Sequence, residues 1–157
     1  RCARGDRIVH ISEYVEAARN RARSYRRCTA EQALTYACED IASRHAPLRT
    51  MNSAEVTDFI GHVCILEDVD VPRVLFGTRQ RSCSAWADRG THTIAISRRT
   101  ASVDLVLHEL SHLLSRSDGH DRDFRLTLVR LARTHAGIQY AALLQSLFTG
   151  TGLDSPA

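Results

Sequence analysis

His108-Glu109-Leu110-Ser111-His112 spells HExxH, and this pentapeptide carries more information than any other part of the chain. An α-helix has about 3.6 residues per turn, so histidines four positions apart lie on one face, within about 40° of each other. Two imidazoles so placed can bind one zinc ion, and the glutamate between them can act on a water molecule held by the metal. We therefore take His108 and His112 as candidate metal ligands and Glu109 as the candidate catalytic base.

The segment around this pentapeptide has the pattern of an amphipathic helix. Thr100 or Ser102 can cap its start, and a polar run over 115–119 ends it. No proline interrupts the segment. Its apolar residues recur at helical spacing, at Val103, Val106, Leu107, Leu110, Leu113 and Leu114. The two histidines are therefore expected on a helix, where their spacing brings them together.

A zinc site that hydrolyses a substrate needs three protein ligands and one open position. His120 is the best candidate for the third ligand, because it comes soon after His112 and follows Gly119, which can turn the chain after the helix. The spacing of a metzincin is absent, since Ser115 and Asp118 stand where its glycine and third histidine would be. A gluzincin needs a downstream glutamate, and the chain has none after the HExxH motif.

Other residues remain open as ligands or as partners of the ligands. Asp118, Asp121 and Asp123 are carboxylate alternatives to the third histidine, or groups that orient the imidazoles. His135 is a further alternative, although a histidine near a helix end can also serve the fold alone. Asp104 is better interpreted as a carboxylate at a helix start, where the helix dipole favours it, than as a partner of a ligand.

These residues predict a zinc-dependent metallohydrolase, and more specifically a peptidase. The two motif histidines and His120 would hold Zn²⁺ through neutral imidazoles and lower the pKa of the bound water towards about 7. Glu109 would take the proton of that water and later deliver it to the leaving amine. The sequence does not single out the group that stabilises the oxyanion; Tyr140, His135 and several arginines are candidates.

Length and composition describe one globular domain. The chain has 157 residues, 43% of them hydrophobic and 25% charged, and we expect a single domain over 1–149 with a loose C-terminal tail over 150–157. Five scattered cysteines without a CxxC pair argue against a disulfide framework or a zinc ribbon and favour a cytoplasmic protein. No stretch is apolar and long enough to span a membrane, and no signal peptide is visible, so we expect no membrane partner.

Apolar spacing and turn signals divide the chain into helices around a short run of strands. Besides the motif helix, helices are expected at 8–26, 29–44, from 52 onward, around 124–132 and around 141–147. Thr29 with Gln32, and Asn52 with Glu55, resemble the capping residues that open the second and third of these helices. Strands are expected at 73–76, 83–87 and 91–96, the last two joined by a turn at Asp88-Arg89-Gly90. The predicted fold class is therefore α+β, with a small antiparallel sheet directly before the HExxH helix and N- and C-terminal helices packed around both.

The strand at 91–96 is our candidate for an exposed sheet edge. An extended peptide could add to such an edge through main-chain hydrogen bonds, which would make it a platform for a substrate. The alternative is that this strand only packs against the motif helix.

Several segments together are similar to one family. They are the strands around Ser84-Ala85-Trp86 and Thr93-Ile94-Ala95-Ile96, the run from Val106 to Leu114, and Gly119-His120-Asp121-Arg122-Asp123-Phe124. Through them the chain resembles a group of small actinobacterial and actinophage metallohydrolases that are related to the SprT-like zincins. The segment from Arg4-Gly5-Asp6-Arg7 to Glu16-Ala17 is more loosely similar to the opening of that family.

The resemblance implies a minimal zincin-like domain that binds zinc and acts on a protein or peptide. The segment beginning Gly119-His120 resembles the HGxxF element of SprT-like proteins, whose histidine is the third zinc ligand. The resemblance therefore supports His120 in that role. The chain departs from the element at Asp121, where the related pattern usually has glycine.

A nucleic-acid-associated protein is the first alternative. SprT-like relatives include proteases that act on DNA-bound proteins, and all 21 basic residues here are arginine. The net charge is only +3, however, and few aromatic residues lie among the arginines, so a solvated helix face explains them more simply. The arginines that motivate this alternative are Arg19, Arg21, Arg23, Arg26, Arg27, Arg98 and Arg99.

Two further alternatives keep a metal site but change its role. A regulatory peptidase resembling the ImmA/IrrE group would share HExxH and commonly takes an acidic third ligand, such as Asp118, Asp121 or Asp123. A metal-binding domain without turnover would need no base. The presence of Glu109 argues against that reading, because structural zinc prefers a closed and often cysteine-rich site.

Overall fold

The chain is α+β, with six helices and five short strands over residues 10–78 and 83–154, the parts that this computed structural model describes. The helices are α1 (Ile11–Ala22), α2 (Ala30–His45), α3 (Ser53–Leu66), α4 (Val103–Leu114), α5 (Arg122–His135) and α6 (Ile138–Thr151). The strands are β1 (Thr50–Asn52), β2 (Arg73–Phe76), β3 (Ala85–Asp88), β4 (Thr93–Ile96) and β5 (Thr100–Ser102). Of the segments discussed above, Arg4–Arg7 lies outside the described residues.

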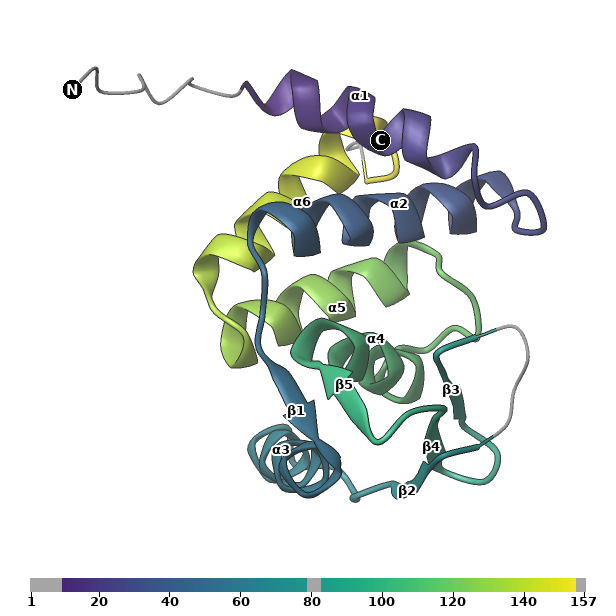
Figure 1. The fold of residues 1–157 in the computed structure, drawn as a ribbon, viewed down its shortest axis with the longest axis vertical. Helices are drawn as coiled ribbons and strands as arrows, with labels where there is room; N and C mark the ends of the chain where they lie inside the picture. The colour runs from purple at the N-terminus through teal and green to yellow at the C-terminus, as the bar shows by residue number, and fades with distance from the viewer. Residues whose placement is uncertain (1–9, 79–82, 155–157) are drawn as a thin grey trace.

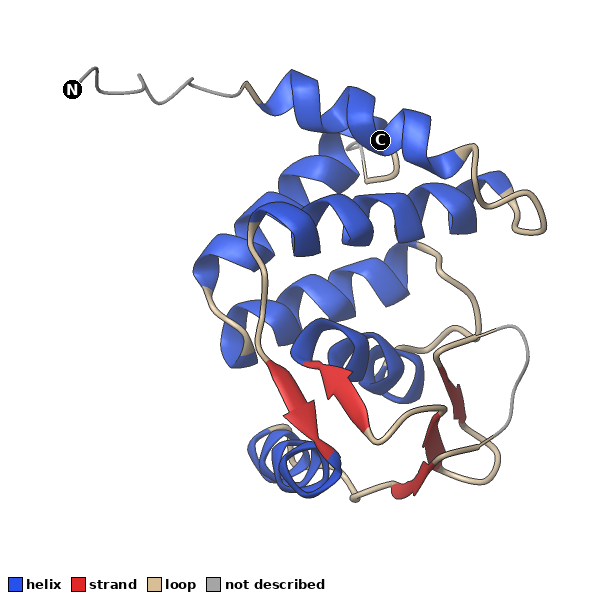
Figure 2. Cartoon of the chain, in the orientation of Figure 1, coloured by secondary structure: helices blue, strands red, loops and turns tan. Residues whose placement is uncertain are grey.

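The helices and the strands occupy different parts of the molecule. Helices α1, α2 and α6 contact one another at one end, and α5 lies between this group and α4 (Figure 1). The strands gather on the far side of α4, where β3 packs against that helix (Figure 2). The HExxH helix therefore lies at the junction of the two parts, with α1, α2, α5 and α6 on one side and the strands together with α3 on the other.

The three-stranded sheet corrects two expectations. Its order is β2-β4-β3, with β2 parallel and β3 antiparallel to β4, so the sheet is mixed rather than antiparallel. The predicted edge strand at 91–96 forms β4, which is the central strand and is buried along its whole length. The apolar run Ile94-Ala95-Ile96 explains this, because a strand covered on both faces and paired on both edges excludes water. The edge strand next to α4 is β3 instead.

A second, two-stranded ribbon fixes the starts of two helices. β1 and β5 pair antiparallel with Met51 opposite Ala101, and both of these side chains are buried. β1 leads directly into α3 and β5 leads directly into α4. Asn52 caps α3 through a reciprocal capping box with Glu55, as the sequence indicated, whereas Ser102 holds the cap position of α4 without a side-chain hydrogen bond.

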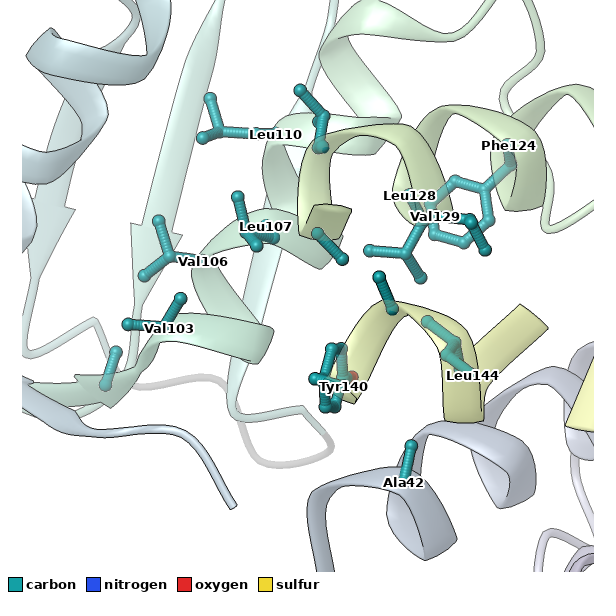
Figure 3. Packing of buried hydrophobic residues seen from close by; sticks show 14 of the residues in the cluster. Ala42, Val103, Val106, Leu107, Leu110, Phe124, Leu128, Val129, Tyr140 and Leu144 are labelled. Atoms are coloured by element: carbon teal, nitrogen blue, oxygen red, sulfur yellow. The ribbon is translucent and has the colours of Figure 1, made fainter. Parts of the chain in front are cut away.

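The core fills the space between α4, α5 and α6. Leu107 and Leu110 of α4 face Leu128 of α5, and Leu144 of α6 closes the same cluster (Figure 3). Each of these four side chains is almost completely buried, and burial of one such side chain contributes roughly 1.5–3 kcal/mol. This packing holds the motif helix rigidly against α5, the helix that follows the loop with His120.

The ordered chain extends further towards its C-terminus than expected. A loose tail was predicted from residue 150, but α6 continues to Thr151, and Asp154 accepts a hydrogen bond from Arg125 at 2.8 Å. Residues 150–154, which were expected to be loose, are therefore held by this helix and by Arg125, because a buried arginine needs acceptors that these residues supply. No helix in the described ranges is long and apolar enough to cross a membrane.

Candidate metal centre

Three histidine side chains converge at the C-terminal half of α4. His108 and His112 lie one turn apart on this helix, and their Nε2 atoms are 3.2 Å apart. His120, in the loop between α4 and α5, brings its Nε2 to 3.1 Å from that of His108. Within residues 10–78 and 83–154, no other three His, Cys, Asp or Glu side chains bring ligand atoms so close together. The structure thus brings together the three histidines that the sequence predicted as metal ligands.

The spacing of these nitrogens suits a tetrahedral metal ion. Zinc binds imidazole nitrogen at about 2.0–2.1 Å, so two ligands of a tetrahedral site lie roughly 3.4 Å apart. The separations of 3.1 and 3.2 Å around His108 are close to that value. Phe124 packs beneath the cluster, with its ring centre 4.5–5.0 Å from the centres of the three imidazoles. The aromatic floor keeps water from that side of the site.

The loop that carries His120 is held by its own polar groups. Asp121 caps α5 by accepting a hydrogen bond from the Phe124 amide at 3.1 Å, and Asp123 accepts one from the Arg116 amide at 2.6 Å. Asp118 is exposed and lies 3.5 Å from Arg89. None of these three carboxylates belongs to the described metal group, so the acidic alternatives for the third ligand have other roles.

Two arginines fix the ends of this loop. Arg89, in the turn after β3, donates hydrogen bonds to the carbonyl oxygens of His112 at 2.8 Å and Ser117 at 2.9 Å. Arg125, almost fully buried in α5, donates one to the carbonyl oxygen of His120 at 2.6 Å. Gly119 does not adopt a positive φ, so the turn depends on these donors rather than on glycine.

Arg125 also connects the loop that carries His120 to distant parts of the chain. Its guanidinium donates to Glu31 of α2 at 2.7 Å and to Asp154 beyond α6 at 2.8 Å. These carboxylates and the carbonyl acceptors offset part of the cost of burying the guanidinium, and removing one of them would be destabilising. The position of His120 therefore depends on residues that no local pattern connects with the motif.

Glu39 of α2 is the direct partner of His108, the first candidate ligand. Its Oε2 lies 2.7 Å from Nδ1 of His108, and 69 residues separate the two in sequence. An ionised carboxylate can only accept, so His108 donates through Nδ1 and presents the lone pair of Nε2 to the cluster. Burial alone would lower the pKa of His108, but the charge and hydrogen bond of Glu39 raise it above 6.5. Asp104 accepts from Ser43 at 2.5 Å instead.

Burial adjusts the protonation of the remaining site residues. It lowers the pKa of His112 and of His120 to about 3, so both imidazoles are neutral at pH 7, as metal ligands must be. Burial also raises the pKa of Glu109 to about 7. A carboxyl group with that pKa can both accept and release a proton near neutral pH.

The cluster opens into a cleft of about 740 Å³. One wall is the edge strand β3, and Glu109, which is only 4% exposed, lines the cleft beside the histidines. Among the described residues, Tyr36 is the one tyrosine in this lining, and its ring stacks on His108 at 5.6 Å. Two candidates for the oxyanion partner do not lie here: Tyr140 is buried in the core, and His135 pairs with Glu67.

Part of the basic face considered above is neutralised within the fold. Arg21 donates to Asp40 at 2.6 Å, and Arg19 lies 3.7 Å from Glu16. Arg98 and Arg99 are exposed. Asp40 and Glu16 thus offset two of the arginine charges that motivated the nucleic-acid alternative.

The chain was compared with protein-family models, with curated proteins and with solved structures, and none of them matches it. The assignment of a function therefore depends on the geometry of the site itself.

Proposed function

We propose that this chain is a zinc-dependent metallohydrolase with a minimal zincin-like domain, and that it hydrolyses peptide bonds. The observation that carries the proposal is the convergence of the Nε2 atoms of His108, His112 and His120 next to the carboxylate of Glu109, which has no hydrogen-bond partner among the described residues. Three ligands on one side and a cleft on the other are the arrangement of a catalytic rather than a structural zinc site.

The donor set favours zinc over other common ions. Three neutral imidazoles suit zinc, whereas magnesium and calcium prefer oxygen ligands, and the aspartates of the loop are engaged elsewhere. When bound, zinc would make a water molecule more acidic and polarise a carbonyl group. The engagement of the loop aspartates elsewhere also disfavours the regulatory peptidases with an acidic third ligand as a model for the site.

Glu109 would act as the general base. Its carboxylate lines the cleft and accepts no hydrogen bond from the described residues, so it is available to take a proton from the attacking water. With its pKa raised by burial to about 7, the same group can return the proton to the leaving nitrogen. Tyr36 is our candidate for a donor to the developing oxyanion, since its side chain lines the same cleft.

The edge of β3 supplies a platform for an extended substrate. This strand pairs with β4 on one side only, and its residues line the cleft next to the histidine cluster. A peptide could pair with the open edge through main-chain hydrogen bonds and place a carbonyl group at the metal. The substrate platform expected at 91–96 is thus reassigned to Ala85–Asp88.

The test compares Glu109→Gln with Asp118→Asn, which changes an exposed acid in the same cleft. Both variants and the wild type should bind one zinc per chain, measured by elemental analysis of the purified protein. Cleavage of a broad peptide library should fall by about 100-fold or more in Glu109→Gln and stay near the wild-type rate in Asp118→Asn. Equal cleavage by Glu109→Gln and the wild type would contradict the proposal, as would a wild type that binds no zinc.

A further inference from the structure

A second cavity, of about 490 Å³, adjoins the proposed zinc site on the side of α2. It shares His108, Glu109, Tyr36 and Ala85 with the cleft, so Glu109 stands where the two spaces meet. A peptide paired with β3 would pass this junction. The peptide side chain next to the cleaved bond could then enter the second cavity.

The lining of this cavity is acidic, and we call it the acidic chamber. It contains the carboxylates of Glu39, Asp40, Asp104 and Glu109, and it contains no arginine among its described lining residues. Arg21 lies outside the lining; it donates to Asp40 and lies over the Tyr25 ring at 5.4 Å, so it offsets the charge of Asp40 alone among the four carboxylates. The remaining acidic side chains therefore give the chamber a negative potential, which attracts cations.

Within the described part of the chain, two acceptors in the chamber lack a donor. Glu109 lines the chamber, is only 4% exposed and has no hydrogen-bond partner among these residues. Glu39 uses one oxygen for His108, while its other oxygen, Oε1, is buried and has no partner in the same ranges. Buried acceptors without donors are costly, so a ligand that brings N–H groups would gain by satisfying them.

The arrangement suits an organic cation better than a metal ion. Within the described ranges, the histidine cluster is the one group of three side chains whose ligand atoms converge, so these carboxylates are too dispersed to hold a metal. A guanidinium carries five N–H donors in a fixed fork, and an alkyl stem can pack on apolar surface. Tyr25, Tyr36 and Leu105 provide aromatic and apolar walls for such a side chain.

We propose that the acidic chamber is a specificity subsite that takes the side chain of an arginine or lysine next to the cleaved bond. This inference rests on the proposed peptidase function, because the chamber is a subsite only if Glu109, which lines both the chamber and the cleft, acts on a peptide bond there. Its volume lies within the roughly 300–1,000 Å³ of ordinary ligand pockets.

The test uses a pair of peptides that differ in one atom group, one with arginine and one with citrulline, its neutral isostere. Binding to the full chain, stripped of metal so that no turnover occurs, is measured by calorimetry. The wild type should bind the arginine peptide about tenfold more tightly or better, the value of charge-assisted hydrogen bonds. Asp104→Asn keeps an acceptor for Ser43 but removes a charge, and it should reduce this preference by at least about threefold.

Asp118→Asn is the matched control, because Asp118 lines the cleft and not the chamber. It should keep the full preference for arginine. Equal binding of the two peptides by the wild type would overturn the inference, and so would failure of both to bind. The comparison of the two peptides on the wild type needs no variant. Misfolding of Asp104→Asn, checked by circular dichroism, would therefore not prevent a decision.

Cleavage by the zinc-loaded chain separates this inference from the proposed function. Hydrolysis of both peptides at equal rates would overturn the subsite and leave the peptidase intact. Tighter binding of the arginine peptide without any hydrolysis would overturn the peptidase and support the chamber as a binding site. Faster hydrolysis beside arginine, lost in part in Asp104→Asn alone, supports both.

Discussion

Among the described residues, two buried histidine–glutamate pairs join different helices, and only one of them belongs to the candidate metal centre. Nδ1 of His108 is 2.7 Å from Glu39, and Nε2 of His135 is 2.9 Å from Glu67. The histidine side chains are 8% and 2% exposed, and the glutamates 13% and 11%. By distance and burial the two pairs are nearly the same, so neither property distinguishes a functional pair from a structural one.

The two pairs differ in whether their remaining hydrogen-bonding atoms have partners. Glu67 also accepts a hydrogen bond from Arg130, so both of its oxygens are satisfied, and the pair joins the end of α3 to α5. Glu39 keeps an oxygen that no group in residues 10–78 and 83–154 bonds, and Nε2 of His108 faces two other imidazoles. We infer that a closed network serves the fold, whereas a network with unmet acceptors at a cavity is available for a ligand.

The largest expected effect comes from replacing the histidines outside the HExxH motif. His120→Ala removes one of three proposed ligands and should weaken zinc binding by more than the roughly 100-fold that loss of a supporting partner costs. His135→Ala should leave zinc affinity unchanged, although it should destabilise the fold. Competition with a coloured chelator measures both affinities. Loss of zinc in His135→Ala with retention in His120→Ala would reverse our assignment of the third ligand.

The next effect compares the two glutamates. Glu39→Gln should weaken zinc binding by about 10- to 100-fold, because the carboxylate that fixes the tautomer of His108 is lost. Glu67→Gln is the matched control and should bind zinc as the wild type does. If the two variants had the same affinity in chelator competition, Glu39 would have no role beyond that of Glu67.

The smallest effect concerns stability in acid. Burial alone would raise the pKa of Glu67, but hydrogen bonds from His135 and Arg130 lower it below 4.5. A depressed pKa stabilises the fold above pH 4.5, and this contribution is lost as the pH falls through the folded-state pKa. Glu67→Gln should therefore cost about 1–3 kcal/mol at pH 7 and less as the pH drops below 4.5. Urea unfolding of the wild type and the variant at pH 7 and below pH 4.5 measures this difference in the free energy of unfolding. A cost of the substitution that did not change with pH would contradict the prediction.

The sequence predicted the parts of the site that depend on local spacing. His108, Glu109 and His112 share one helical turn, and His120 follows in the next loop, so a pattern read along the chain was sufficient. Glu39 was missed because it reaches His108 from 69 residues away and carries no motif of its own. Arg125 was missed for the same reason, since its partners Glu31 and Asp154 are 94 and 29 residues distant.

The fold shows the same limit. Helices α2 and α3 were located by their capping residues Thr29 and Asn52, which act locally. The strands at 50–52 and 100–102 have three residues each, too few for a periodic pattern, and they form because the ribbon buries Met51. The predicted edge strand proved to be central, because alternation within a strand does not reveal which strands lie beside it.

The central claim, that three histidines hold one zinc ion, is tested most directly by anomalous diffraction at the zinc edge from crystals of the zinc-loaded chain. We predict one zinc peak about 2.0–2.1 Å from Nε2 of His108, His112 and His120, with its fourth position open to the cleft. A zinc ion bound by His135 or by a loop aspartate in place of His120, or no zinc at this cluster, would contradict the account.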